Sequence, residues 1–85
     1  MARLPVDSTE PSIEMRAFAE NIRDLRIKSG LSQRAFAEQA GITQAYLVKV
    51  EKARTNLSLN RASQLAEFVG TPLWKLIKKS PSHTP

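Results

Sequence analysis

Apolar residues recur three and four positions apart near the start of the chain, which is the spacing of one face of an α-helix. The residues on this face are Met15, Phe18, Ile22 and Leu25. Ser12 precedes the run, and a serine there can accept a hydrogen bond from a free N–H group of the first turn. Gly30 interrupts the spacing. The pattern therefore predicts a first helix of about four turns between Ser12 and Gly30.

A second, shorter helix is predicted from Gln33 to Gln39 or Ala40, with Ser32 as its N-cap. Its apolar residues face inward beneath Leu31. These residues are Phe36, Ala37 and Ala40. Gly41 follows, and glycine can adopt the left-handed backbone conformation that a tight turn between two helices needs.

Thr43 then caps a third helix, predicted from Gln44 to Lys52. Leu47 and Val50 lie three positions apart and face inward with Ile42. The opposite side presents Gln44, Ala45, Val48 and Lys49. Two short helices that pivot on one glycine, with polar side chains leading the second, are typical of a helix-turn-helix, which presents one helix to the major groove of DNA.

The rest of the chain predicts two further helices after a polar loop at residues 54–58. The fourth helix is marked by Leu59, Ala62, Leu65, Ala66 and Val69 and ends at Gly70. Thr71-Pro72 provides an N-cap followed by a proline at the first helical position, which predicts a short fifth helix through Lys78. We expect an all-α, five-helix domain at residues 12–79, a flexible N-terminal segment at residues 1–11 and a disordered tail at residues 80–85.

Composition narrows the classes of function. Thirteen Lys and Arg against eight Asp and Glu give a formal net charge of +5, which favours a polyanionic partner. The chain has no cysteine, and its one histidine, His83, has no second ligand or base beside it. No catalytic constellation or phosphate loop is present, so we expect no enzyme activity, no cofactor, no metal and no small-molecule ligand. With no signal peptide or membrane span in the sequence, a cytoplasmic protein is expected.

Together these residues resemble the lambda-repressor-like, or XRE-type, helix-turn-helix family. The resemblance covers roughly residues 14 to 78 and rests on Phe18, Ile22, Leu25-Arg26, Gly30-Leu31-Ser32-Gln33, Phe36-Ala37, Ala40-Gly41-Ile42-Thr43, Leu47, Val50-Glu51, Ser58-Leu59, Leu65-Ala66 and Gly70. In size the chain is similar to the stand-alone controller proteins of restriction-modification systems and mobile elements. It departs from the family at Ala53, where a glycine is usual, and at Leu57, where a proline is common.

The resemblance and the helix register together identify candidate DNA contacts. For reading bases we expect Gln44, Ala45 and Lys49, with Val48 or Tyr46 at the margins, because side chains of the first turns of a recognition helix face the groove floor. The alternative is that Gln44 and Lys49 are only solvated surface residues. For the phosphates the candidates are Gln33, Thr43, Arg54 and Asn56. For Gln33 the alternative is ordinary polarity at a helix start, and for Arg54 it is a solvated charge.

The resemblance also implies an ion pair between Arg26 and Glu51, joining the first and third helices. If it is partly buried, the pair fixes the angle of the reading helix; the alternative is two exposed charges of little energetic value. In the last helix, Trp74 and Lys78 lie on a face separate from Leu73, Leu76 and Ile77, which suits a dimer contact. The alternative for Trp74 is that it folds over the edge of its own core.

The leading hypothesis is a homodimeric, sequence-specific transcription regulator of a roughly palindromic operator in double-stranded DNA. The alternative is a protein-interaction module, such as an antitoxin or adaptor, whose main partner is another protein. Glu38 is a candidate contact for RNA polymerase, or a plain partner of Arg34 one turn before it. No contact with a membrane is expected.

Overall fold

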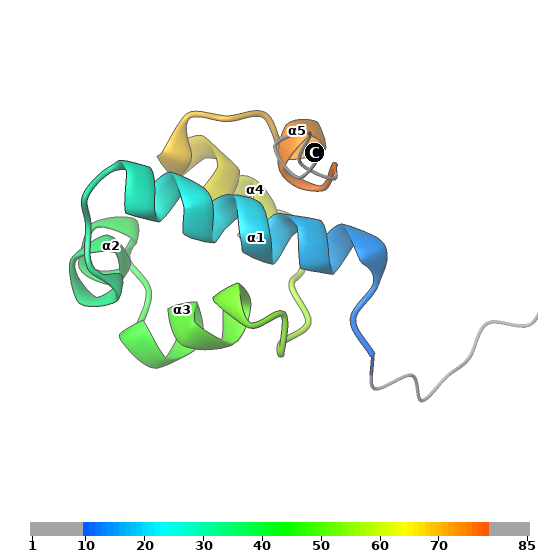
Figure 1. The fold of residues 1–85 in the computed structure, drawn as a ribbon, viewed down its shortest axis with the longest axis horizontal. Helices are drawn as coiled ribbons and strands as arrows, with labels where there is room; N and C mark the ends of the chain where they lie inside the picture. The colour runs from blue at the N-terminus through cyan, green and yellow to red at the C-terminus, as the bar shows by residue number, and fades with distance from the viewer. Residues whose placement is uncertain (1–9, 79–85) are drawn as a thin grey trace, which may run out of the picture.

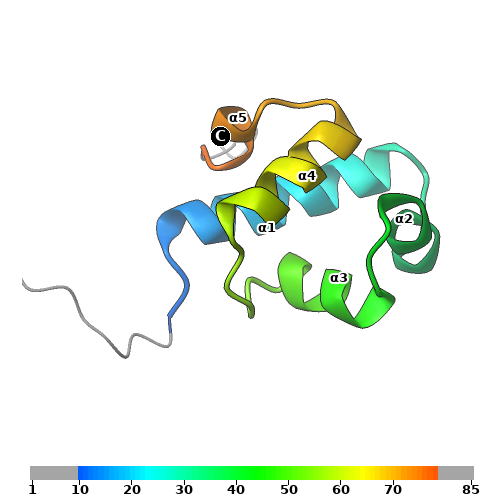
Figure 2. The same cartoon turned by 180° about the vertical axis from the view of Figure 1, so that it is seen from behind.

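The computed structural model describes residues 10–78, which form five helices and no strand. The helices are α1 (Ile13–Lys28), α2 (Gln33–Ala40), α3 (Gln44–Glu51), α4 (Leu59–Val69) and α5 (Leu73–Leu76). Helix α1 runs through the middle of the domain, with α2 and α3 on one side and α4 and α5 on the other (Figure 1). The view from behind shows the same division (Figure 2). The predicted all-α, five-helix fold is confirmed.

A hydroxyl side chain caps the start of each of the four longer helices. Ser12, Ser32, Thr43 and Ser58 each accept a hydrogen bond of 3.0 Å from the backbone N–H three residues on. Such a bond satisfies one of the N–H groups that a helix start leaves without a partner. The caps predicted at Ser12, Ser32 and Thr43 are confirmed, whereas the sequence analysis placed Ser58 only in a polar loop.

The same four helices end in one backbone motif, in which a residue with left-handed backbone follows the last turn and two N–H groups return to helix carbonyls. At the end of α2, Gly41 (φ 76°) donates to Glu38 O and Ile42 donates to Ala37 O. At the end of α3 the left-handed position is held by Ala53 (φ 55°), the one non-glycine residue with positive φ among residues 10–78. Ala53, which stands where a glycine is usual, therefore has a strained backbone conformation in this turn.

The core lies where α1 crosses the other helices. Its largest buried side chains are Phe18, Ile22, Phe36, Leu47, Val50, Leu65 and Leu76. Phe36 of α2 and Phe68 of α4 meet edge to face, with ring centroids 5.1 Å apart. Leu59 was predicted from the periodicity of the fourth helix and is the first residue of α4, but its side chain is 78% exposed.

The prediction for the fifth helix was wrong at both ends. Thr71 does not cap it, because the N–H of Thr71 donates to Ala66 O (3.0 Å) and Thr71 thus belongs to the ending of α4. Pro72 holds the N-cap position and makes no side-chain cap bond. The helix stops at Leu76 and does not reach Lys78. Similarly, α3 ends at Glu51, with Lys52 as its C-cap.

No helix within residues 10–78 is long and apolar enough to cross a membrane. The segment predicted to be flexible at residues 1–11 lies outside the described residues except for Glu10 and Pro11. The tail predicted at residues 80–85, including His83, lies outside them entirely.

Candidate nucleic-acid interface

Helix α3 presents three of the predicted base-reading side chains to solvent. Gln44, Ala45 and Lys49 are exposed, whereas Leu47 and Val50 on the opposite side are completely buried. Because successive residues of a helix turn by about 100°, the three exposed residues share one continuous arc. The structure therefore brings the predicted residues together on one face, with the half-buried Val48 inside this arc and the half-buried Tyr46 at its edge.

A largely buried polar network holds α3 in place. Glu51 is the last residue of α3, and its carboxylate receives hydrogen bonds from Arg26 Nε (2.6 Å) and Arg26 Nη2 (3.1 Å) of α1. Gln33 Nε2 at the start of α2 donates to the same carboxylate (3.0 Å), and Arg26 Nη1 donates to the carbonyl of Leu31 (3.0 Å). The side chains of Arg26 and Glu51 are only 13% and 4% exposed. The structure thus contains the ion pair that the resemblance implied.

Through this network, side chains of α1 and α2 bind the Glu51 carboxylate of α3. A buried charge that loses its partner costs far more than an exposed one, so the network is sensitive to removal of either member. It also changes the interpretation of Gln33, which was predicted as a phosphate contact. One N–H of the Gln33 amide is engaged by Glu51, and the side chain is half-buried. Only its second N–H remains to donate to a phosphate.

The other predicted phosphate contacts lie around α3. Thr43 is exposed, and its hydroxyl oxygen accepts the bond from Tyr46 N that caps α3, which leaves the O–H free to donate. Arg54 and Asn56 are exposed in the connection between α3 and α4. The backbone N–H of Arg54 donates to Lys49 O (2.8 Å), so the residue is held in the turn that ends α3.

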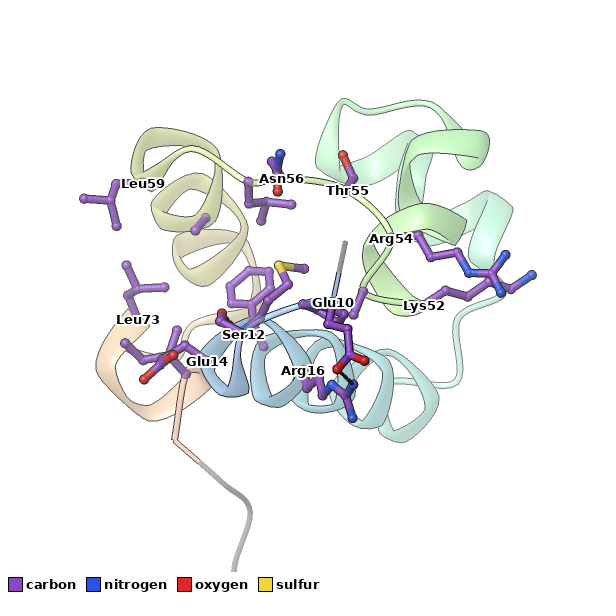
Figure 3. Close-up of a pocket in the computed structure, with 17 residues that line it drawn as sticks. Glu10, Ser12, Glu14, Arg16, Lys52, Arg54, Thr55, Asn56, Leu59 and Leu73 are labelled. Atoms are coloured by element: carbon purple, nitrogen blue, oxygen red, sulfur yellow. Dashed lines mark hydrogen bonds and ion pairs between the residues drawn. The ribbon is translucent and has the colours of Figure 1, made fainter. Parts of the chain in front are cut away.

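Arg54 and Asn56 also line an open hollow between the start of α1, the α3–α4 connection and α5 (Figure 3). Leu57, Leu59, Leu73 and Ile77 line its apolar part, and Glu10, Arg16, Lys52 and Arg54 line its charged part. Arg16 and Glu10, which lie together at one side of it, form an exposed ion pair (3.7 Å). Two of the large apolar side chains that line this hollow are exposed, Leu59 by 78% and Ile77 by 38%.

Trp74 is 60% exposed on α5, so the alternative that it folds over its own core does not describe this structure. Lys75 Nζ and Lys78 Nζ lie 5.5 and 6.0 Å from the centre of its ring. Trp74 and Lys78 are therefore neighbours, as their spacing predicts. Leu76 faces the core as predicted, whereas Ile77 is partly exposed.

Two contacts of the site region were missed by sequence analysis. The guanidinium carbon of Arg61 in α4 lies 5.5 Å from the ring centre of Tyr46 in α3. Asn21 Nδ2 in α1 donates to the carbonyls of Leu76 (2.9 Å), Lys78 (3.1 Å) and Lys75 (3.4 Å) at the end of α5. Both join residues of different helices, and no local pattern in the sequence signals such a pairing. Within residues 10–78 no three His, Cys, Asp or Glu residues gather as a metal site.

Comparisons with known proteins agree with this geometry. Residues 22–73 match the model of a protein family described as helix-turn-helix. The chain is 28% identical over 74 residues to a hypothetical transcription factor of Neisseria meningitidis, covering 87% of this chain and 70% of that protein. It is 34% identical over 61 residues to the control protein C.SmaI of Serratia marcescens, covering 72% of this chain and 73% of that protein.

Solved structures show the same fold. The hypothetical transcription factor NHTF from Neisseria superposes with a TM-score of 0.73 at 28% identity, over 94% of this chain and 89% of that chain. The restriction-modification controller protein C.AhdI of Aeromonas hydrophila superposes with a TM-score of 0.67 at 29% identity, over 76% of this chain and 98% of that chain.

Proposed function

The chain belongs to this helix-turn-helix family, and from that premise we infer that it is a transcription regulator that binds double-stranded DNA sequence-specifically through α3. The observation that carries the inference is the exposed arc of Gln44, Ala45 and Lys49 on a helix that the Arg26–Glu51 ion pair holds to α1. A reading helix must be both exposed and held at a fixed angle, because base contacts require defined geometry. The match to proteins named as transcription factor and controller supports the same function.

The exposed side chains have the chemistry for reading bases. Gln44 can pair with the two adjacent groups of an adenine edge, Lys49 can donate to guanine, and the Ala45 methyl group can contact the methyl group of thymine. Gln33, Thr43, Arg54 and Asn56 would contact phosphates and fix the register of α3 on the duplex. The net charge of +5 supplies affinity that does not depend on sequence.

We propose that the regulator acts as a homodimer on a roughly palindromic operator. A two-fold dimer would place two copies of α3 about 34 Å apart, one turn of DNA. Trp74, 60% exposed and flanked by Lys78, supports α5 as part of the dimer interface. If dimerisation is coupled to DNA binding, the protein responds to its own concentration, which suits control of its own gene.

The proposed function implies a cytoplasmic protein that meets RNA polymerase on DNA. Glu38 is exposed near the end of α2, and within residues 10–78 no ion pair joins it to Arg34, although the two lie one turn apart. Glu38 therefore stays a candidate for polymerase contact, and the structure does not contain its predicted pairing with Arg34.

The alternative function is a protein-interaction module. The hollow beside α5 favours it, because exposed apolar side chains such as Leu59 and Ile77 gather there and such patches often mark protein contacts. In that case the main partner, such as a toxin in an antitoxin pair, would bind this surface, and α3 would contribute little.

A titration of DNA from upstream of the protein's own gene tests the proposal. Fluorescence anisotropy with scrambled competitor is measured for the wild type, Lys49→Ala, Gln44→Ala and the control variant Lys28→Ala on the far side of α1. Competitor-resistant binding that Lys49→Ala and Gln44→Ala weaken at least tenfold, with Lys28→Ala unchanged, is the expected result. Binding that scrambled DNA removes completely, or that tolerates both α3 variants, contradicts reading by this helix.

A further inference from the structure

We propose that Arg61, at the start of α4, binds a DNA phosphate on the side of α3 opposite to Gln33, with the ring of Tyr46 as the platform that positions its guanidinium. This inference rests on the proposed function and adds to it a backbone contact that fixes the second side of the reading helix. Three observations carry it: the place of Tyr46 on α3, the contact between Arg61 and Tyr46, and the lack of an acidic partner for Arg61 among residues 10–78.

The helix geometry places Tyr46 on one flank of the exposed arc and Glu51 on the other. With about 100° between successive residues, Gln44, Ala45 and Lys49 point outward, and Tyr46 and Glu51 border them on opposite sides. Gln33 Nε2 at the start of α2 donates a hydrogen bond to the Glu51 carboxylate (3.0 Å). The guanidinium carbon of Arg61 at the start of α4 lies 5.5 Å from the centre of the Tyr46 ring. The starts of α2 and α4 therefore flank the reading helix.

A helix in the major groove has one phosphate backbone along each side. Gln33 and the first turn of α2 lie on the first side, where the phosphate contact is already expected. The matching residue on the second side must be a donor that reaches past α3. Arg61 is exposed and its guanidinium lies against Tyr46 on this side of α3, whereas Tyr46 itself is half-buried.

The surroundings of Arg61 leave its donors available. Its only side-chain hydrogen bond within residues 10–78 is a long one from Nη1 to Gln64 Oε1 (3.4 Å), and no carboxylate of this part of the chain pairs with it. A guanidinium that lies over an aromatic face keeps its edges free, and an arginine edge matches a phosphate with two parallel bonds. Its backbone N–H is fixed by the Ser58 cap (3.0 Å), so the residue starts from an ordered position.

The test measures how binding to a random-sequence 20-base-pair duplex depends on salt, because phosphate contacts act on any sequence. For each phosphate that a bound protomer no longer neutralises, the slope of log K against log salt falls in magnitude by about 0.9. We expect Arg61→Gln to lower the magnitude of this slope by about 0.9 and to weaken binding roughly tenfold near 0.1 M salt. Tyr46→Leu should lose part of the same affinity, and Tyr46→Phe, which keeps the ring, should bind as the wild type does.

Lys28→Gln is the matched control, since it also removes one positive charge but lies with Thr71 and Lys75 on the α5 side of α1. A slope for Arg61→Gln equal to that of the wild type overturns the proposed contact and leaves the proposed function intact. An equal loss for Lys28→Gln overturns it too, because the effect would then come from net charge. Wild-type protein that binds neither this duplex nor upstream DNA contradicts the proposed function itself. Thermal melting of each variant shows that it is folded.

Discussion

The guanidinium of Arg26 and the carboxylate of Glu51 meet through hydrogen bonds of 2.6 and 3.1 Å between side chains that are almost completely buried. Arg26 belongs to the central helix α1, and Glu51 ends the helix that presents Gln44, Ala45 and Lys49. The same contact therefore serves the stability of the domain and the angle of its reading helix. A change in this pair should affect both properties together.

We predict that Glu51→Gln lowers the free energy of unfolding by about 3 kcal/mol, because it leaves the buried guanidinium of Arg26 without its counter-charge. For a domain of this size that loss corresponds to a fall in Tm of roughly 12 °C or more. Circular dichroism measures the melting, and anisotropy measures the accompanying loss of DNA affinity. Glu38→Gln, an exposed carboxylate, should change stability by less than about 0.5 kcal/mol. Equal melting curves for Glu51→Gln and the wild type would show that the pair contributes nothing.

Ala53 has positive φ in a turn where α1, α2 and α4 use glycine, and this difference gives a stabilising prediction. A left-handed conformation costs a residue with a Cβ roughly 1–2 kcal/mol, and glycine loses part of that gain through its more flexible unfolded chain. Ala53→Gly should therefore stabilise the protein by about 0.5–1 kcal/mol, measured by urea denaturation.

The control is the reverse change in the same motif. Gly41 has φ 76°, and a Cβ there would meet no atom within 4 Å, so Gly41→Ala tests backbone strain alone. It should destabilise the protein by about 1 kcal/mol. A destabilised Ala53→Gly variant would mean that the turn after α3 is not strained.

Local signals in the sequence were enough to predict most of the fold. The hydroxyl residues Ser12, Ser32 and Thr43 and the glycines after three of the helices act through backbone groups a few residues away, so their effect can be inferred from the chain alone. The exposed arc of α3 follows from helix periodicity in the same way. Whether its residues contact DNA is a matter of the partner and stays a prediction.

The structural features that could not be predicted from the sequence depend on contacts between distant residues. The fifth helix was predicted too long because Thr71 is used by α4 and because Asn21, more than fifty residues earlier, donates to the carbonyls of Leu76 and Lys78. The engagement of Gln33 by Glu51 and of Arg61 by Tyr46 likewise requires the packing of separate helices. Periodicity states which face is buried but not which polar side chains meet at its edge.

Asn21 is predicted to hold the C-terminal end of α5 against α1. Its amide nitrogen donates to Leu76 O at 2.9 Å and to Lys78 O at 3.1 Å, and a single-turn helix has few other means of fixing its last carbonyls. Asn21→Ala should cost about 1–2 kcal/mol and speed hydrogen exchange in residues 73–78 while leaving exchange in α2 and α3 unchanged. Asn60→Ala, at an exposed amide of α4, is the control. Unchanged exchange around Leu76 would show that the apolar contacts alone hold α5.

The exposed side chain of Trp74 gives a prediction about dimer formation. Its ring is 60% exposed beside Lys75 and Lys78, and a large aromatic side chain left in solvent by its own domain is well suited to be buried by a second copy. We expect Trp74→Ala to weaken a wild-type dimer by at least tenfold in Kd, since truncating an aromatic at the centre of an interface costs about 2 kcal/mol or more. Sedimentation velocity over a concentration series measures the change.

Trp74→Phe should retain most of the association, because it keeps an aromatic ring at the same position. Identical sedimentation of Trp74→Ala and the wild type across the series would exclude Trp74 from the interface, and a wild-type protein that remains monomeric throughout would refute the dimer itself.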